Sequence, residues 1–185
     1  MKKLLLGIAA VCLAGFTFAQ DAPLWMRHSV ISPDGTTIAF TYKGDIYTVP
    51  VAGGRAMQIT TNPAYDTAPV WSPDSKRIAF ASDRMGSLDV YIVAKDGGEP
   101  RRLTTHSGSE TPLAFTDAGH VLFSAGIMPS AEAVVFPSNG QFNQVYRVSV
   151  EGGRPTMISS MPMECISINK EGAMLYQDKK GYEDY

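Results

Sequence analysis

The stretch DIYTVPVAGGR, from Asp45 to Arg55, contains the unit that decides the fold of this 185-residue chain. An acidic residue opens it, an aliphatic–Tyr pair begins an alternating strand, and Gly-Gly follows. Two related stretches come later, DVYIVAKDGGE at 89–99 and QVYRVSVEGGR at 144–154. Each starts 44 or 55 positions after the copy before it. A repeat of this length, made of short strands and tight turns, is typical of β-propeller blades.

The clearest complete unit lies between residues 68 and 105. Its four strands are expected at 68–72, 77–82, 89–94 and 100–105. Pro73-Asp74 predicts the first turn, because Pro presets φ and Asp can bond the backbone beyond it. Gly97-Gly98 predicts a two-residue hairpin, since Gly takes positive φ without steric cost. The last strand carries Pro100 and polar residues, as an exposed edge strand often does.

The same plan recurs on both sides of this unit. Further strands are expected at 37–41, from Asp45, at 57–61, 113–117 and 120–124, from Gln144, and at 165–168 and 174–177. The last pair has neither an aliphatic–Tyr strand nor a Gly-Gly turn after it. We therefore predict an all-β fold: a partial propeller of four-stranded antiparallel blades, three complete and a fourth begun. Because a propeller needs about four to eight blades, residues 20–185 are expected to be the N-terminal, truncated part of such a domain.

Residues 1–19 have the pattern of a secretory signal peptide. Lys2 and Lys3 form a charged start, residues 4–18 are almost wholly apolar, and small residues precede a cleavage position after Ala19. The alternative is an uncleaved membrane anchor, but the apolar run is short for a span. Lipidation at Cys12 is disfavoured by the large Val11 before it. We expect an exported protein, periplasmic or extracellular, with no membrane span after cleavage.

The composition excludes some structural features and some classes of function. After cleavage only Cys165 remains, so no intramolecular disulfide can form, and its alternating surroundings favour a buried strand position. The formal net charge is -2 and 18% of residues are charged, which provides no basic patch for nucleic acid. With 17 Gly and 12 Pro, turns should be frequent and long helices absent beyond the signal.

The segments SPDGTTIAFTYKGDIYTVPVAGGRAMQIT and WSPDSKRIAFASDRMGSLDVYIVAKDGGEPRRLT resemble the WD-like propeller repeat shared by TolB and the N-terminal propellers of tricorn-type peptidases. The resemblance extends from Trp25 to Tyr185. A signal that leads almost directly into the first blade is more similar to an exported tricorn protease homologue, because TolB places a separate domain before its propeller. The resemblance implies a propeller that gates or presents peptides to a serine peptidase core behind a PDZ-like domain.

No position of the chain matches the catalytic motif of that family, so we predict no catalytic, cofactor-binding or metal-binding residue. The implied partners are the downstream PDZ-like and peptidase domains and peptide or protein ligands; the oligomeric state is left open. The rival interpretation is a non-enzymatic, TolB-like periplasmic module that binds proteins. A sugar- or metal-dependent lyase propeller is a third, but the chain lacks the histidine cluster which that chemistry needs.

Few residues invite a chemical role. The histidines His28, His106 and His120 occupy different repeat positions. His106 with Glu110 could suggest a metal site or a triad, but a pair without a third ligand is weak evidence. We expect these two residues in a solvated loop between blades.

The most structured polar cluster is Ser82-Asp83-Arg84 followed by Asp89. It could be a carboxylate pair on the channel rim, or a turn cap with an Asp–Arg pair that fixes the hairpin. Asp45 recurs at the position of Asp89, which favours the structural interpretation. The repeated aromatic residues are likewise expected to pack between blades: Phe40, Tyr47, Trp71, Phe80, Tyr91, Phe123 and Tyr146.

One stretch breaks the repeat. Phe123 and Tyr146 are 23 positions apart, against 11 for Phe80 and Tyr91, so an insertion falls within 125–143. Insertions in repeat proteins map to loops, often on a binding face. The apolar residues of this insertion predict packing either on a partner, a neighbouring domain or a peptide, or back on its own blade.

Overall fold

A computed structural model describes residues 25–126, 143–161, 163–169 and 171–178, and within them the chain is all β. Three four-stranded antiparallel sheets and one two-stranded sheet follow one another along the chain. The first sheet contains β1 (Arg27–Ile31), β2 (Thr37–Tyr42), β3 (Asp45–Pro50) and β4 (Met57–Gln58). The second contains β5 (Asp66–Trp71), β6 (Arg77–Ser82), β7 (Asp89–Ala94) and β8 (Arg101–Arg102). The third contains β9 (Glu110–Asp117), β10 (His120–Ala125), β11 (Gln144–Ser149) and β12 (Thr156–Ser159), and the fourth β13 (Met163–Ile168) and β14 (Met174–Asp178).

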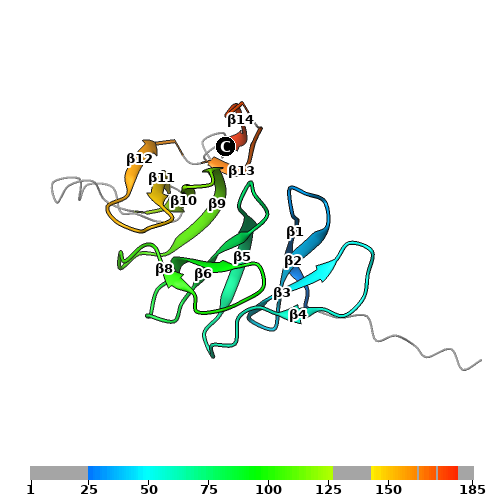
Figure 1. Ribbon diagram of the computed structural model, residues 1–185. Coiled ribbons are helices and arrows are strands. Elements are labelled where there is room, and N and C mark those ends of the chain that lie inside the picture. The colour runs from blue at the N-terminus through cyan, green and yellow to red at the C-terminus, as the bar shows by residue number, and fades with distance from the viewer. Residues whose placement is uncertain (1–24, 127–142, 162, 170, 179–185) are drawn as a thin grey trace, which may run out of the picture.

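These sheets are blades 1 to 4 of a partial propeller. In each complete blade the strands pair in chain order, as a meander. The first strands of the blades, β1, β5, β9 and β13, contact one another in succession, whereas β4, β8 and β12 lie at the periphery (Figure 1). The predicted fold class is confirmed. Cys165 lies in β13, but its side chain is outside the described part of the structure.

The two middle strands of each blade carry the repeat most faithfully. Each pair of middle strands aligns six residues with six, so that a Phe always lies opposite a Tyr. The ring centroids are 5.9 Å apart for Phe40–Tyr47, 6.0 Å for Phe80–Tyr91 and 5.7 Å for Phe123–Tyr146. Cross-strand aromatic pairs of this kind stabilise a sheet and fix its register.

The outer strands of blades 1 and 2 are shorter than predicted, two residues each. The segments expected as strands at 57–61 and 100–105 turn inward after Gln58 and Arg102. Ile59 and Leu103 become buried there, and their N–H groups donate to Ile46 O and Val90 O, both at 2.8 Å. The burial of Ile59 and Leu103 thus ends each outer strand earlier than the alternating pattern predicts.

Two apolar clusters lie between the blades. Blades 1 and 2 enclose the first cluster: Ala39, Ile46, Ile59, Trp71, Ile78, Phe80, Tyr91 and Val93. Blades 2 and 3 enclose the second: Ala79, Val90, Ile92, Leu103, Phe115, Val121, Phe123, Ala125, Tyr146, Val148 and Val150. Blade 2 therefore contributes a bulky aromatic face to the joint with blade 1 and a smaller aliphatic face to the joint with blade 3. The prediction that Trp71, Phe80, Tyr91, Phe123 and Tyr146 pack between blades is confirmed.

The Ser-Pro-Asp turns lie at one rim of the propeller, which we call the turn rim because β1–β2 and β3–β4 are joined there. Ser32 Oγ donates to Asp34 Oδ1 at 2.5 Å, and that same Ser oxygen accepts the N–H of Thr37 at 3.0 Å. Ser72 and Asp74 repeat the contact at 2.5 Å. The Ser32 hydroxyl is the main cause of the lowered pKa of Asp34.

The Gly-Gly segments also lie at the turn rim. The prediction of a two-residue hairpin at Gly97-Gly98 is wrong. Strand β7 ends at Ala94, whose carbonyl accepts the Gly97 N–H at 2.9 Å. The tight turn is therefore 94–97, and the connection to β8 is longer than two residues. Gly97 and Gly98 nevertheless have φ of 92° and 120°, values that disfavour a side chain, so positive φ was predicted correctly.

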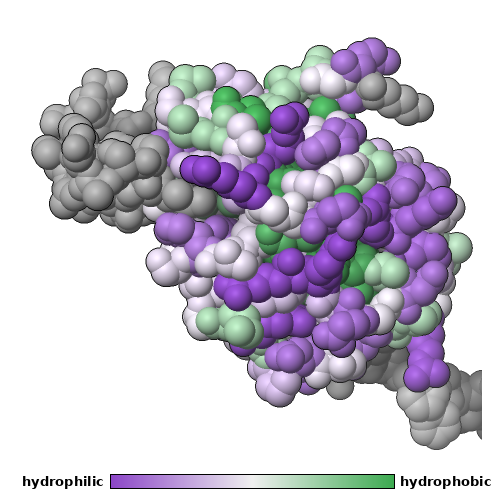
Figure 2. All heavy atoms as spheres, turned by 60° about the vertical axis from the view of Figure 1, so that its left-hand side comes forward, coloured by the Kyte–Doolittle hydropathy of each residue, from purple (hydrophilic) through white to green (hydrophobic). Residues whose placement is uncertain are grey.

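The surface on one side of the molecule is mostly hydrophilic, with hydrophobic side chains visible in narrow bands among the polar ones (Figure 2). This pattern fits blades that bury their apolar faces against each other and expose polar edges. In the described residues no helix is long and apolar enough to cross a membrane.

Candidate functional site

The second rim holds the polar residues singled out in the sequence. The inner strands begin there, at Arg27, Asp66 and Glu110, and the middle strands are joined there. We call it the connector rim, because the segments that lead from one blade to the next arrive at it. Two backbone hydrogen bonds link neighbouring blades at this rim: Asp66 N to Gly44 O and Glu110 N to Leu88 O, both 2.7 Å.

Arg84 pairs with Asp66. Arg84 Nη2 lies 3.0 Å from both Asp66 oxygens, and its Nε donates to Ser82 Oγ at 2.8 Å. The carboxylate is fully buried and the arginine side chain is 12% exposed. The guanidinium also lies over the rings of Tyr91 and Phe80, with its central carbon 4.5 and 5.6 Å from their centroids. This arrangement neutralises a buried acid and fixes the β6–β7 connection.

Asp89 has a different cationic partner. Arg102 Nη2 lies 2.8 Å from Asp89 Oδ2 and donates to Oδ1 at 3.0 Å. Asp83, expected in the same cluster, instead accepts the Tyr65 N–H at 2.8 Å. The predicted structural role of the cluster is supported, but the expected pairing is wrong, because Arg84 reaches back to Asp66 on the inner strand.

Asp45 occupies in blade 1 the position of Asp89, and among the described residues no arginine bonds to it. Gln58 Nε2 donates to its Oδ2 at 3.0 Å and Thr60 Oγ1 to its Oδ1 at 3.3 Å. Burial, helped by the nearby Asp66 carboxylate, raises the pKa of Asp45. Blade 1 therefore replaces the ion pair of blade 2 with neutral donors.

Glu110 is the counterpart of Asp66 in blade 3, and it corrects the expectation of a solvated loop. The side chain is fully buried, and within the described residues neither carboxylate oxygen has a well-formed hydrogen bond. Burial raises its pKa to about 7, and Asp89 acts in the same direction. The Thr104 hydroxyl, Arg102 and the His106 N–H lie near enough to oppose that rise. In the part of the chain that the structure describes, no arginine pairs with Glu110 as Arg84 pairs with Asp66.

The three histidines lie apart, as predicted. His28 Nδ1 is 3.0 Å from Thr67 Oγ1 across the joint between blades 1 and 2. His106 Nδ1 accepts the Gly108 N–H at 3.0 Å, and His120 Nδ1 lies 3.0 Å from Asp117 Oδ1. Among the described residues, no three His, Cys, Asp or Glu side chains cluster as a metal site would require.

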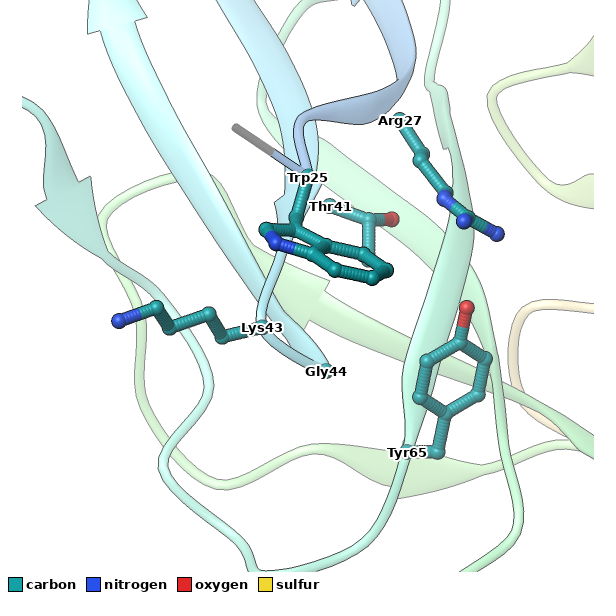
Figure 3. A pocket seen from close by; sticks show the side chains of 6 residues that line it. All are labelled: Trp25, Arg27, Thr41, Lys43, Gly44 and Tyr65. Atoms are coloured by element: carbon teal, nitrogen blue, oxygen red, sulfur yellow. The ribbon is translucent and has the colours of Figure 1, made fainter. Parts of the chain in front are cut away.

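A cavity of about 420 Å³ opens at the connector rim beside blade 1 (Figure 3). It is lined by Trp25, Arg27, Thr41, Lys43, Gly44 and Tyr65. The Arg27 guanidinium and the Tyr65 hydroxyl point to the same side of Trp25, whereas Lys43 extends away (Figure 3). The Lys43 ammonium lies over the Tyr42 ring, 5.3 Å from its centroid. Sequence reasoning missed this pocket, because Trp25 and Tyr65 reach it from segments far apart in the chain.

A second, larger cavity of about 700 Å³ lies on the apolar face of blade 1. Its lining includes Ile38, Phe40, Tyr47 and Val49. These four side chains correspond to Ile78, Phe80, Tyr91 and Val93 of blade 2, which blade 1 covers. Phe40 and Tyr47 were predicted to pack between blades, and they lie on the face that serves this purpose in blade 2.

The insertion begins and ends at the connector rim, since β10 ends at Ala125 and β11 starts at Gln144. Residues 127–142 lie outside the described structure, so neither of the two predictions for the loop is tested. Residues 1–19, the predicted signal peptide, lie outside it as well.

The comparisons with known proteins agree with this architecture. The profile of the tricorn protease N-terminal beta propeller domain matches residues 23–184, and the chain belongs to this family. Tricorn protease homolog 1 of Streptomyces coelicolor (strain ATCC BAA-471 / A3(2) / M145) is 35% identical over 102 residues, which are 55% of this chain and 9% of the relative. The uncharacterized peptidase YuxL of Bacillus subtilis (strain 168) is 30% identical over 129 residues, 69% of this chain and 20% of the relative.

Solved structures show the same blades. The structure of a putative TolB from Agrobacterium tumefaciens has a TM-score of 0.65 and 25% identity to this chain. The likeness covers 85% of this chain and 57% of that protein. The chain thus spans one fifth or less of the length of the two peptidase relatives and little more than half of the TolB structure.

Proposed function

We propose that this chain is the propeller portion of an exported tricorn-like serine peptidase and gives peptides access to a catalytic core, or scaffolds that core, without catalysing the reaction. The family match over residues 23–184 carries this proposal. The relatives named as a tricorn protease homologue and as a peptidase support it. The PDZ-like and peptidase domains of the parent protein, and peptide or protein ligands, are its proposed partners.

The geometry of the polar residues supports a role without catalysis. A hydroxyl or thiol nucleophile needs a base that is itself oriented by a third group. Thr67 meets His28, but in the described residues no carboxylate bonds to that histidine. His120 meets Asp117, but among the described residues no hydroxyl bonds to that histidine, and the Thr116 hydroxyl donates to Asp117 instead. The buried acids of the connector rim serve the joints between blades.

The test is a peptidase assay on purified residues 20–185 with casein and short fluorogenic peptides. We expect background rates only. Turnover that survives rigorous purification and disappears on substitution of one serine would refute the proposal. The same assay on the parent protein should give turnover that depends on residues outside this chain.

The apolar face of blade 1 supports a propeller that continues beyond the blades described. The residues of blade 1 that correspond to the covered aromatic face of blade 2 line a cavity of about 700 Å³ and contact no other described blade in an apolar cluster. Open apolar faces and unpaired strand edges promote association. We expect isolated residues 20–185 to self-associate and to bind a hydrophobic dye more strongly than the parent protein. A monodisperse, cooperatively melting monomer in light scattering and calorimetry would contradict this expectation.

Export to the periplasm or the extracellular space belongs to the same proposal and rests on the signal pattern of residues 1–19. Expression of the intact reading frame followed by cell fractionation should yield a mature N-terminus at Gln20. A protein that keeps Met1 and stays inside the cell would contradict export.

The likeness to the putative TolB structure favours a second candidate, a non-enzymatic module that binds proteins. The coding sequence that follows Tyr185 distinguishes the two. A PDZ-like segment and a serine peptidase core would support the enzyme, whereas a stop after about six blades would support the binding module.

A further inference from the structure

In the pocket lined by Trp25, Arg27, Thr41 and Tyr65, no polar side-chain group forms a hydrogen bond or an ion pair within the described residues. Arg27 stands on β1 directly opposite Thr41 on β2, so the two side chains share one face of the sheet. The Thr41 side chain is 2% exposed, and its hydroxyl has no hydrogen-bond partner among the described residues. A buried hydroxyl without a partner costs free energy, so it marks a place where a ligand atom could bind.

Three donors surround the same space. The Arg27 guanidinium, the Thr41 hydroxyl and the Tyr65 hydroxyl all lie beside one edge of Trp25 (Figure 3). The central carbon of the guanidinium is 5.8 Å from the centroid of the Trp25 ring. No Asp or Glu lines the cavity, and in the described residues Arg27 forms no ion pair. In the described residues the pocket therefore presents a cation without an ion-pair partner and the Tyr65 hydroxyl against an aromatic wall, with the buried Thr41 hydroxyl in its lining.

The repeat itself shows that blade 1 does not need these residues. In blade 2 the positions of Arg27, Thr41 and Lys43 are taken by Thr67, Ala81 and Asp83. There the Thr67 hydroxyl is close to a histidine and Asp83 holds the backbone of Tyr65, so these residues serve the scaffold. A residue that recurs in every blade usually stabilises the blade, whereas neither Arg27 nor Thr41 is kept at the equivalent position of blade 2.

We propose that this pocket binds a carboxylate group of a peptide. The guanidinium fork matches the two oxygens of a carboxylate, and the two hydroxyls can donate to their remaining lone pairs. Trp25, which is 69% exposed, offers apolar surface to the carbon atoms next to the charge. The inference rests on the proposed function of peptide access and deepens it, because it names acidic peptides as the ligands that this rim prefers.

The carboxylate can come from a Glu side chain or from the C-terminus of the peptide, and three probes separate the sources. The first is acetyl-Gly-Ser-Glu-Ser-Gly-amide, and the second has Gln in place of Glu. The third is the Gln peptide with a free C-terminal carboxylate. Isothermal titration calorimetry on the purified protein at low ionic strength measures each dissociation constant. We expect the two acidic probes to bind about tenfold or more tightly than the neutral one.

Three variants test whether the preference for acidic over neutral probes arises in this pocket. Arg27→Gln should reduce the preference for the acidic probes to about twofold or less, since the guanidinium supplies the charge. Thr41→Val should weaken acidic binding severalfold without lowering the melting temperature, because Val has nearly the same shape and no unpaired hydroxyl. Lys76→Gln removes a positive charge from the exposed turn-rim position 76 and should leave all three affinities unchanged.

Two results would overturn the assignment while peptide access stands: equal affinity for the acidic and neutral probes, or an acidic preference that persists in Arg27→Gln. Failure of all three probes to bind would overturn both the pocket assignment and peptide access. Melting curves of every variant exclude misfolding as the cause of lost binding. A preference that is lost in Arg27→Gln and kept in Lys76→Gln supports the proposal.

Discussion

At the turn rim, blades 1 and 2 use the same residues for the same hydrogen bonds, whereas at the connector rim equivalent positions differ from blade to blade. Ser32–Asp34 and Ser72–Asp74 form identical 2.5 Å contacts. At the other rim, Asp66 is held by an arginine, whereas its counterpart Glu110 has no such partner in the described residues. The turn rim thus preserves the geometry of the blade, and the connector rim is where the blades diverge.

The contrast between the two inner-strand acids has a simple cause. Arg84 comes from the short β6–β7 connection, which returns its guanidinium to the start of β5. The corresponding connection in blade 3 is the insertion, and residues 126–143 contain no Lys or Arg. Glu110 therefore avoids the cost of a buried charge by a raised pKa, rather than by an ion pair.

The largest effect is expected from removal of the arginine of blade 2. Arg84→Met leaves Asp66 buried without its partner and should lower the free energy of unfolding by about 3–5 kcal/mol. Chemical denaturation measures the change. Arg55→Met, at an exposed position, is the control and should stay within about 0.5 kcal/mol of the wild type. If Arg84→Met costs less than about 1 kcal/mol, or if adding Asp66→Asn does not recover stability, the ion pair is not what holds this joint.

The turn rim should be nearly as sensitive to backbone strain. Gly97→Val with Gly98→Val places β-branched side chains at φ of 92° and 120° and should cost on the order of 3 kcal/mol. Space is not the obstacle, because the nearest atom to a Cβ at Gly97 would be 3.6 Å away. Glu99→Val tests the same side chain at an exposed neighbour outside the positive-φ region. An unchanged thermal midpoint for the double variant would show that the turn tolerates side chains.

Glu110 should make the stability of the protein depend on pH. A carboxyl group whose folded pKa is raised to about 7 from 4.5 stabilises fully below pH 4.5 and loses this contribution as pH rises through 7. Glu110→Gln cannot ionise, so its stability relative to the wild type should rise by about 2 kcal/mol between pH 5 and pH 8. Denaturation at both pH values checks this, with Glu99→Gln as the exposed control. A stability difference that does not vary with pH would mean that Glu110 has a partner when charged.

The smallest change in stability is expected at Thr41 in the pocket, and the equivalent region of blade 2 provides the comparison. Thr41 carries a buried, unbonded hydroxyl where blade 2 has Ala81. Thr41→Val removes that hydroxyl and should leave stability unchanged or raise it by up to about 1 kcal/mol in the absence of ligand. Thr67→Val is the matched change in blade 2 and should destabilise, because it removes the contact with His28. Destabilisation by Thr41→Val would indicate that its hydroxyl is bonded in the free protein.

Much of the blade could be predicted from sequence. The middle strands β6 and β7 agree residue for residue with their predicted ranges, and the aromatic pairs lie between blades as expected. A local signal for the missed acids also exists, because Asp66 and Glu110 each stand five positions before an aromatic residue of the inner strand, Trp71 or Phe115.

Alternation and turn chemistry are local properties, so the sequence by itself determined the middle strands and the positive-φ glycines, whereas the outer strands of blades 1 and 2 end earlier than alternation predicts. The tertiary structure alone decided which acid meets which arginine, how deeply Glu110 is buried, and that Trp25, Arg27, Thr41 and Tyr65 surround one cavity. The two acid–arginine pairs join separate strands and connections of blade 2, and the cavity joins Trp25 to Tyr65, which is 40 positions later in the chain. Their energies depend on burial and on the angle between sheets, and neither is encoded in the periodicity of any single strand.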